Sequence, residues 1–244
     1  MRIVMLSAGL MLFSFAAQAA EITVLAPGLI GPGFATLAEQ WKAQTGNSAV
    51  LGAGAGTVGR IQQAIAEGRV ADLVLLPPNE LAGMADKLKP GSERKIGRVV
   101  FGLAVKSGTP HPDISTAEKF RAALKGKRVA YNDPAIGSLA GKMVDALLKQ
   151  PEYAGVIAGP STTQGGVAVA DGKADMAVAV ETEEVLNKGI DIVGPVPDGI
   201  GLTITMSGAV PANAAHPDEA AAFLAFITRP EAAAVFKPTG IAIP

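Results

Sequence analysis

The chain has 244 residues, with 21 lysines and arginines against 22 aspartates and glutamates and no cysteine. A charge balance this close to zero provides no polycationic surface, which excludes nucleic acid and anionic membranes as main partners. The lack of cysteine excludes a disulfide framework, a thiol nucleophile and cysteine-ligated metal centres, so stability has to come from a hydrophobic core.

The first residues have the layout of a secretory signal peptide. Arg2 supplies a positive charge, residues 3–16 form an apolar stretch, and Ala17-Gln18-Ala19 is a small-x-small cleavage site. The alternative is a membrane anchor, but the apolar stretch is short for a bilayer span. We therefore expect cleavage of residues 1–19 and a mature protein in the periplasm.

Strand-like and helix-like segments alternate along the rest of the chain, with turn residues between them. The apolar runs predict strands at residues 21–26, 49–51, 72–76, 98–105, 127–131, 175–180, 190–193 and 202–210. Helical spacing and end signals predict helices at residues 34–45, 58–67, 79–87, 115–124, 138–150, 164–171, 217–227 and 230–236; Ser115 and Glu118 form a capping box at the fourth. This alternation indicates an α/β fold with mainly parallel sheets flanked by helices.

The order of the segments indicates two lobes. The strand–helix pattern runs twice, the long strands 98–105 and 202–210 separate the two sets, and the final helices have no strands of their own. A chain that leaves one lobe and later returns to it gives this layout. We expect residues 20–101 to begin lobe I, residues 102–201 to form lobe II and residues 202–244 to complete lobe I. The ligand is expected in the cleft between the lobes, with a hinge at the two long strands.

Residues 54–59, Gly-Ala-Gly-Thr-Val-Gly, match the G-x-G-x-x-G fingerprint of dinucleotide binding. That fingerprint needs an acidic residue at the end of the second strand, where it reaches a ribose hydroxyl. Asp72 instead precedes its strand, and prolines follow the strand. We interpret the segment as a glycine-rich loop before a helix, where unpaired N–H groups and the helix dipole favour an anion.

Three other loops have the same character, namely residues 26–28, 133–138 and 162–166. Each alone is typical of an ordinary strand-to-helix turn. Four such loops at the carboxyl ends of strands, on two lobes, together predict a ligand cleft. Arg60 and Lys142 lie one turn into helices that follow these loops, where they would be solvated or would meet an anion.

Residues suited to catalysis or metal binding are few. His111 and His216 each stand in a His-Pro-Asp segment before a predicted helix, which is typical of a helix cap, and a pair of metal ligands is the alternative. Glu181, Glu183 and Glu184 follow a buried strand, where we expect the solvated start of a helix. No cofactor, metal or covalent step is expected.

The loops and their surroundings resemble substrate-binding proteins of ABC importers, in particular the molybdate-binding family of the type II periplasmic fold. The resemblance covers the mature chain and rests on "EITVLAPGL", "GAGAGTVGRIQQAIAEGRVADLVLLPPNE", "VAYNDPAIGSLAGKMVDALL", "GKADMAVAVETEE" and "FLAFITRPEAAAVFKPTGI". It implies a two-lobed, monomeric binding protein that is not an enzyme. Its implied partners are a small anionic ligand and an ABC transporter permease in the inner membrane.

The chain departs from that family in its ligand loops. Relatives that bind molybdate have serines where this chain has Gly28 and Leu29, and again where it has Ala55 and Gly56, and a tyrosine in place of Val180. An oxyanion buried without these hydroxyl donors loses hydrogen bonds, so we favour a small organic acid over an oxyanion such as molybdate. The candidate ligand-binding residues are Pro27, Gly28, Leu29, Ala55, Gly56, Thr57, Ser138, Leu139, Gln164, Gly165, Gly166 and Val180.

Two other functions remain open from the sequence. One is an exported enzyme, such as a metal-dependent hydrolase, that uses Asp133, the glutamates at 181–184 or the two histidines. The other is a ligand-sensing module that docks on a membrane receptor. Turnover or a bound metal would indicate the enzyme, and neighbouring permease and ATPase genes would indicate transport.

Overall fold

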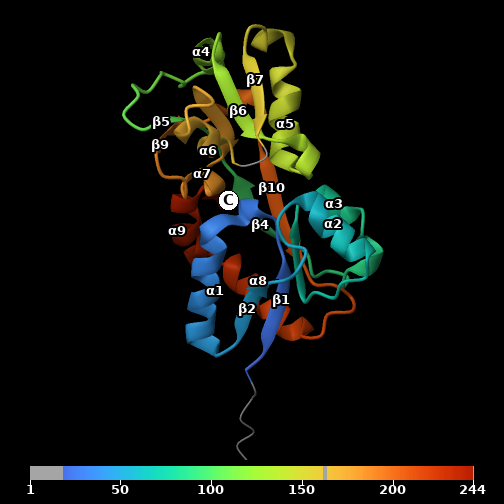
Figure 1. The fold of residues 1–244 in the computed structure, drawn as a ribbon. Helices are drawn as coiled ribbons and strands as arrows, with labels where there is room; N and C mark the ends of the chain where they lie inside the picture. Colours follow the sequence, from blue (N-terminus) through green and yellow to red (C-terminus); the bar gives the residue numbers. More distant parts are fainter. Residues whose placement is uncertain (1–18, 162–163, 244) are drawn as a thin grey trace, which may run out of the picture.

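The structure, a computed structural model, describes residues 19–161 and 164–243. Residues 1–18 of the expected signal peptide, and Thr162 and Thr163 of the fourth predicted loop, lie outside this part. The described chain forms two lobes, each built on one sheet with flanking helices (Figure 1). The predicted two-lobed α/β fold is thereby confirmed. Within the described residues, no helix combines the length and apolar character needed to cross a membrane.

Lobe I contains a six-stranded sheet in the order β11-β4-β10-β3-β1-β2. Its strands are β1 (Glu21–Leu25), β2 (Ser48–Leu51), β3 (Leu73–Leu76), β4 (Arg94–Val99), β10 (Ile204–Ala209) and β11 (Ile241–Ala242). Its helices are α1 (Gly31–Thr45), α2 (Val58–Ala66), α3 (Pro78–Ala82), α8 (Pro217–Ile227) and α9 (Ala233–Phe236).

The alternation of side chains along β1 divides the core of lobe I between the two faces of the sheet. Val24 belongs to the cluster that contains α1 and α8, where the rings of Trp41 and Phe223 pack with centroids 5.0 Å apart. Its neighbour Leu25 belongs to the cluster on the other face, together with Ile61 of α2. The helices α1 and α2, which follow the first two strands, are therefore anchored on opposite faces.

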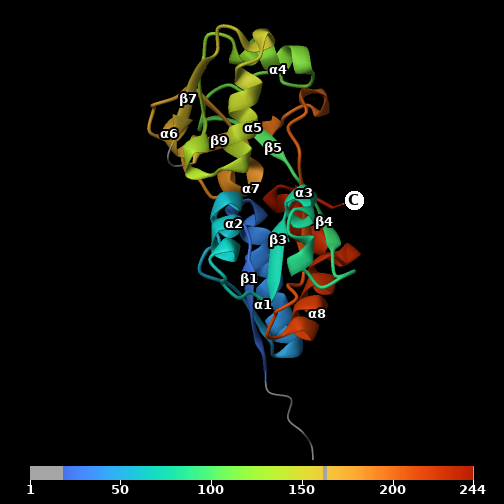
Figure 2. The ribbon, with the colours of Figure 1, turned by 90° about the vertical axis from the view of Figure 1, so that its right-hand side faces the viewer.

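Lobe II contains a five-stranded sheet in the order β7-β6-β8-β5-β9. Its strands are β5 (Phe101–Lys106), β6 (Arg128–Asn132), β7 (Ile157–Ser161), β8 (Met176–Val180) and β9 (Ile190–Pro195). Its helices are α4 (Ala117–Leu124), α5 (Leu139–Leu148), α6 (Gly165–Ala170) and α7 (Glu181–Glu184). Figure 2 shows α7 at the junction with lobe I, where it packs against α1 and the turn Gly28–Ile30.

Both sheets are mixed, which corrects the prediction of mainly parallel sheets. The strands β1, β2 and β3 pair in parallel, as do β6, β7 and β8. In contrast β10 is antiparallel to β3 and β4, and β5 is antiparallel to β8 and β9. The antiparallel strands β4, β5, β9 and β10 lie next to the two crossings of the chain between the lobes, so they do not belong to repeated strand–helix–strand units.

The predicted strand at 98–105 is two strands in different lobes. β4 ends at Val99 and β5 begins at Phe101, and Val100 between them is held on both sides. Its N–H donates to the carbonyl of Gly240 of lobe I, and its carbonyl accepts from the N–H of Glu181 of lobe II, both at 2.9 Å. The apolar run is continuous across this break, so hydrophobicity alone gave no sign of it.

Other element boundaries also differ from the predictions. The helix expected at 79–87 ends at Ala82, where α3 stops, and a short 3-10 turn follows at Ala85–Lys87. The strand expected at 202–210 begins at Ile204. Two strands were missed because their sequences carry weak signals: β7 contains glycine and proline, and β11 has two residues.

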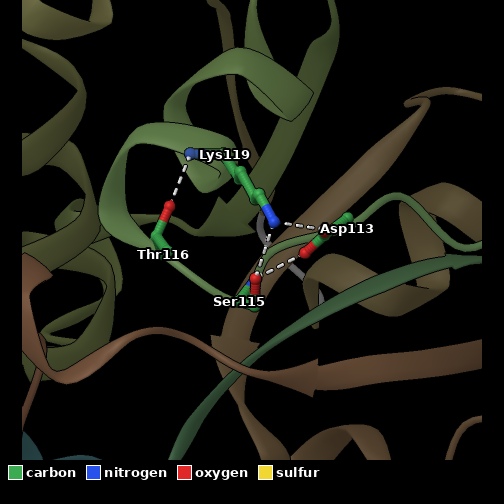
Figure 3. Close-up of polar contacts among 4 residues, drawn as sticks. All are labelled: Asp113, Ser115, Thr116 and Lys119. Atoms are coloured by element: carbon green, nitrogen blue, oxygen red, sulfur yellow. Dashed lines mark hydrogen bonds and ion pairs between the residues drawn. The ribbon is translucent and has the colours of Figure 1, made fainter.

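The predicted capping box of α4 is wrong by one residue. Thr116 is the N-cap, since its Oγ1 accepts the N–H of Lys119 at 3.2 Å (Figure 3). Ser115 donates its N–H to the Asp113 carboxylate at 2.9 Å, and Lys119 Nζ lies 2.6 Å from that carboxylate. The bonds from Lys119 and Ser115 hold the pKa of Asp113 well below its usual range.

Candidate functional site

A small cavity lies between the two lobes. Its volume is about 40 Å³, and its lining residues come from both lobes: Pro27, Leu29, Gly56, Thr57, Val58, Asn132, Ile136, Ser138, Leu139, Ala140 and Glu183. This space holds a few water molecules at most, since one water needs roughly 10–15 Å³ on the same measure. The lobes therefore leave little free space between them in this structure, and the cleft is closed.

The first turns of two helices meet across this cleft. Thr57 caps α2, with Oγ1 accepting the N–H of Arg60 at 3.2 Å, and Ser138 caps α5, with Oγ accepting the N–H of Gly141 at 3.0 Å. A 3.5 Å hydrogen bond from Thr57 Oγ1 to the carbonyl of Ile136 links the lobes. Both helices direct the positive ends of their dipoles at the cleft, which favours a negatively charged group there.

The two glycine-bearing loops of lobe I hold each other through backbone hydrogen bonds. Gly28 donates its N–H to the carbonyl of Gly56 at 2.6 Å, and Gly56 donates its own N–H to Ala26 at 3.1 Å. Gly56 has a φ of 138°, a conformation that favours glycine. These two N–H groups are therefore engaged within the protein, in contrast to the expectation that the loop offers them to a ligand.

A carboxylate lines the cleft. Glu183, in α7, accepts a 2.8 Å hydrogen bond at Oε2 from Nδ2 of Asn132, the last residue of β6. Its Oε1 lies 3.8 Å from the position that a Cβ on Gly28 would occupy. Burial raises the pKa of Glu183, and the hydrogen bond from Asn132 opposes this shift in part. Among the described residues that line the cavity, none carries a positive charge.

Of the other two glutamates of α7, Glu184 is buried and Glu181 is half-buried, so the prediction of a solvated helix start is wrong. Glu184 is 2% exposed, and its carboxylate accepts the N–H of Gly166 at 3.0 Å and Nδ2 of Asn187 at 3.1 Å. Burial raises the pKa of both Glu181 and Glu184. Because the N–H of Gly166 donates to Glu184, it is not directed to a ligand.

Half of the predicted ligand-binding residues line the cavity. These are Pro27, Leu29, Gly56, Thr57, Ser138 and Leu139, and Gly28 adjoins the cavity through its neighbours. The predicted residues that do not line it are Ala55, Gln164, Gly165, Gly166 and Val180. Val180 is fully buried in β8 and precedes α7.

Sequence reasoning missed Asn132 and three apolar lining residues, Val58, Ile136 and Ala140, and it named Glu183 only for the exported-enzyme alternative. A signal for Asn132 and Glu183, the polar pair of the cleft, was available. Asn132 ends β6 and Glu183 follows β8, and both strands carry their carboxyl ends to the same edge of the lobe II sheet.

The remaining candidates lie away from the cleft or at its edge. His111 lies in lobe II, with Nε2 3.9 Å from Asp191, whereas the N–H of His216, at the start of α8, donates to Asp72 of lobe I at 2.8 Å. The two histidines therefore do not form a metal-binding pair. The described residues contain no group of three or more histidines, cysteines or acidic residues suited to a metal ion. Arg60 is exposed, with Nη1 3.6 Å from the Cβ position of Gly56.

The described chain thus has two α/β lobes with a small cavity between them. The family model of bacterial extracellular solute-binding proteins matches residues 22–242, and the chain belongs to this family. This agrees with the resemblance seen in the sequence. A sequence relative, the aconitate isomerase of Pseudomonas sp., is 29% identical over 229 residues, which are 90% of this chain and 87% of that protein.

Solved structures of proteins named for molybdenum, molybdate or sulfate share the fold. The substrate-binding domain attributed to a molybdenum ABC transporter of Clostridium difficile has a TM-score of 0.72 at 18% sequence identity. The match covers 93% of this chain and 100% of that domain. The periplasmic molybdate-binding protein of Azotobacter vinelandii has a TM-score of 0.68 at 19% identity, and the match covers 91% of this chain and 99% of that protein. The sulfate-binding protein SubI of Mycobacterium tuberculosis has a TM-score of 0.68 at 19% identity, and the match covers 91% of this chain and 86% of that protein.

Proposed function

We propose that this chain is a periplasmic solute-binding protein that closes its two lobes over a small organic acid and delivers it to an ABC importer. The observation that carries the proposal is the pair of capped helix starts, at Thr57 and Ser138, which face one cleft from opposite lobes. A carboxylate between them would receive N–H donors and favourable dipoles from both lobes, and so would stabilise the closed form.

The lining of the cleft favours an organic acid over a tetrahedral oxyanion. Leu29, Ile136 and Leu139 supply apolar surface, and Ser138 and Thr57 supply hydroxyl groups among the described lining residues. A tetrahedral oxyanion presents hydrogen-bond acceptors on every side, so next to Glu183, and with no basic residue among the described lining residues, it would be short of donors. A small acid with a carbon skeleton meets both the apolar and the polar part of the lining.

A thermal-shift panel of molybdate, tungstate, sulfate, phosphate and small carboxylates tests the proposal. A ligand at about 100 times its dissociation constant should add roughly 2.7 kcal/mol to the free energy of unfolding, which is several degrees for a protein of this size. We expect a carboxylate to give this shift. A shift with molybdate or tungstate instead would identify an oxyanion carrier, and the organic-acid assignment would be wrong.

The aconitate isomerase relative and the position of Glu183 favour a second candidate, an exported isomerase of a small unsaturated carboxylate. A carboxylate base with a raised pKa can remove a proton from a carbon next to a bound carboxyl group and return it to the other end of the allylic system. Nothing else is consumed in this proton transfer.

The two candidates are separated by incubating the protein with cis-aconitate or trans-aconitate in D₂O and following both isomers by NMR. A carrier binds without turnover. An isomerase interconverts the two compounds, whether or not the transferred proton exchanges with D₂O, and Glu183→Gln abolishes the interconversion. Binding without turnover and without import by a co-expressed permease would indicate a sensing module.

A further inference from the structure

The polar pair of the cleft has more hydrogen-bond acceptors than the protein satisfies. Asn132 uses Nδ2 to donate to Glu183, and its Oδ1 is buried without a hydrogen-bond partner in the described part of the chain. A buried acceptor left unpaired costs about 1–3 kcal/mol. Asn132 is a lining residue of the cleft, so the donor that the described chain does not provide would come from a ligand bound there.

The orientation of this amide is fixed by its neighbour. If the Asn132 side chain were turned over, Oδ1 would face the Glu183 carboxylate and two acceptors would meet. An ionised Glu183 therefore keeps Nδ2 on its own side and leaves Oδ1 as the unpaired atom. The carboxylate, whose pKa is raised by burial, is also short of donors, since the single bond from Asn132 only partly opposes the effect of burial.

The other polar groups of the cleft are hydrogen-bond donors that can bind an acceptor on a ligand. Ser138 Oγ accepts the N–H of Gly141, so its hydroxyl proton is available to a ligand acceptor, and the first turns of α2 and α5 present N–H groups. The cleft thus combines donors suited to a carboxylate with two acceptors, on Asn132 and Glu183, that require a donor.

We propose that the Asn132–Glu183 pair selects a small carboxylate that carries its own hydrogen-bond donor, a hydroxyl or an ammonium group, and rejects the same acid without one. This inference rests on the proposed function of the cleft. An acid that lacks the donor leaves Asn132 Oδ1 unpaired and gives the Glu183 carboxylate no further hydrogen bond. A site built to bond a substrate hydroxyl or amine discriminates strongly against the analogue that lacks it.

Isothermal titration with matched acids tests the inference. The sets are L-malate, L-aspartate and succinate; L-lactate, L-alanine and propionate; and citrate and tricarballylate. We expect at least one hydroxy or amino acid to bind roughly tenfold more tightly, or better, than its unsubstituted partner, because one lost buried hydrogen bond is worth about that factor. The hydroxyl and ammonium members show which donor is used.

Glu183→Gln tests the pair directly, because glutamine keeps the shape of the side chain, removes the charge and adds a donor. We expect the discrimination within a set to fall by roughly tenfold in this variant. Glu181→Gln is the matched control, since Glu181 belongs to the same helix and does not line the cavity. It should leave the discrimination unchanged, and circular dichroism checks that both variants are folded.

The outcomes separate the inference from the function. If in every set that binds the unsubstituted acid binds as tightly as its substituted partners, the inference is wrong while the carrier function stands. If Glu183→Gln preserves the discrimination, the pair is not its source and the inference is wrong. If no acid of the panel binds, the proposed function fails and the inference fails with it.

Discussion

Gly59 of α2 and Gly137, the residue before the cap of α5, face each other across the closed cleft: a Cβ added to Gly59 would lie 3.5 Å from the Cα of Gly137. Leucine at position 59 would place three further carbons where the other lobe lies. We expect Gly59→Leu to hold the lobes apart and to weaken ligand binding by roughly tenfold or more, since closure brings contacts from both lobes to the ligand. Small-angle scattering would show a larger radius of gyration in the presence of ligand.

Gly59→Ala is the matched control. A Cβ at 3.5 Å is in ordinary van der Waals contact, so alanine fits the closed form. It should keep the affinity and stabilise α2 by up to about 1 kcal/mol, because alanine is a better helix former than glycine. Unchanged affinity in the leucine variant would show that binding does not require this closed geometry.

Ser138→Ala should affect both stability and binding. The hydroxyl caps α5 through the N–H of Gly141, and loss of an N-cap costs about 1 kcal/mol of protein stability. The same hydroxyl lines the cleft, so we also expect weaker ligand binding. The measurements are urea unfolding and titration of the ligand found in the panel.

Thr116→Ala is the control for this second effect. Thr116 caps α4 in the same way, with a 3.2 Å bond to the N–H of Lys119, and does not line the cavity (Figure 3). It should lose a similar amount of stability and keep its affinity for the ligand. Equal losses of affinity in the two variants would mean that Ser138 acts on binding only through the stability of lobe II.

The extent to which the sequence predicted this structure depends on how local each signal is. The caps at Thr57 and Ser138 follow from a polar residue before a helical pattern, and both belong to the site. The break at Val100 was missed because it depends on hydrogen bonds to Gly240 and Glu181, which are distant in sequence. No local pattern reports such partners.

The glutamates of α7 show the same limit at the site. A run of three acids at a helix start is typical of a solvated surface, and the pattern gives no information on what packs against it. In this fold α7 lies at the junction of the lobes, so Glu184 is buried against the start of α6 and Glu183 lines the cleft. Tertiary position, rather than residue type, makes these groups candidates for function.

The raised pKa of Glu181 predicts a pH-dependent gain in stability for Glu181→Gln. Below its ordinary pKa of 4.5 this carboxyl is neutral in the folded and the unfolded chain and costs nothing. As the pH rises from 4.5 through the raised pKa of the folded state, stability is lost, and above it the loss is complete. Glutamine avoids this cost, so the variant should unfold at a higher temperature than the parent at pH 7, with the difference vanishing near pH 4.

For Asp175→Asn we expect the opposite change in stability at pH 7, a loss instead of a gain. The hydrogen bonds from Arg128 lower the pKa of Asp175, so its contribution to stability is present above the ordinary value of 3.8 and is lost as the pH falls through the lowered value. This variant should be less stable than the parent at pH 7, with the difference shrinking in acid. Melting curves of both variants from pH 3 to pH 8 should therefore diverge in opposite directions; parallel curves would contradict the pKa directions.

Gly141→Ala tests the contact that joins the polar pair to α5. In a helix, replacing glycine with alanine normally stabilises the protein. Here, however, a Cβ on Gly141 would lie 2.0 Å from the backbone oxygen of Asn132. A backbone atom cannot move aside as the end of a flexible side chain can. We expect a loss of about 1–3 kcal/mol from overpacking, seen as a lower urea midpoint with an unchanged slope. Because relief of the clash displaces Asn132, ligand discrimination should weaken as well.

Gly59→Ala, the same substitution in the first turn of α2, is the control and should show neither loss. A stable Gly141→Ala variant would mean that α5 and the end of β6 are free to separate. The fixed geometry of the Asn132–Glu183 pair would then be wrong.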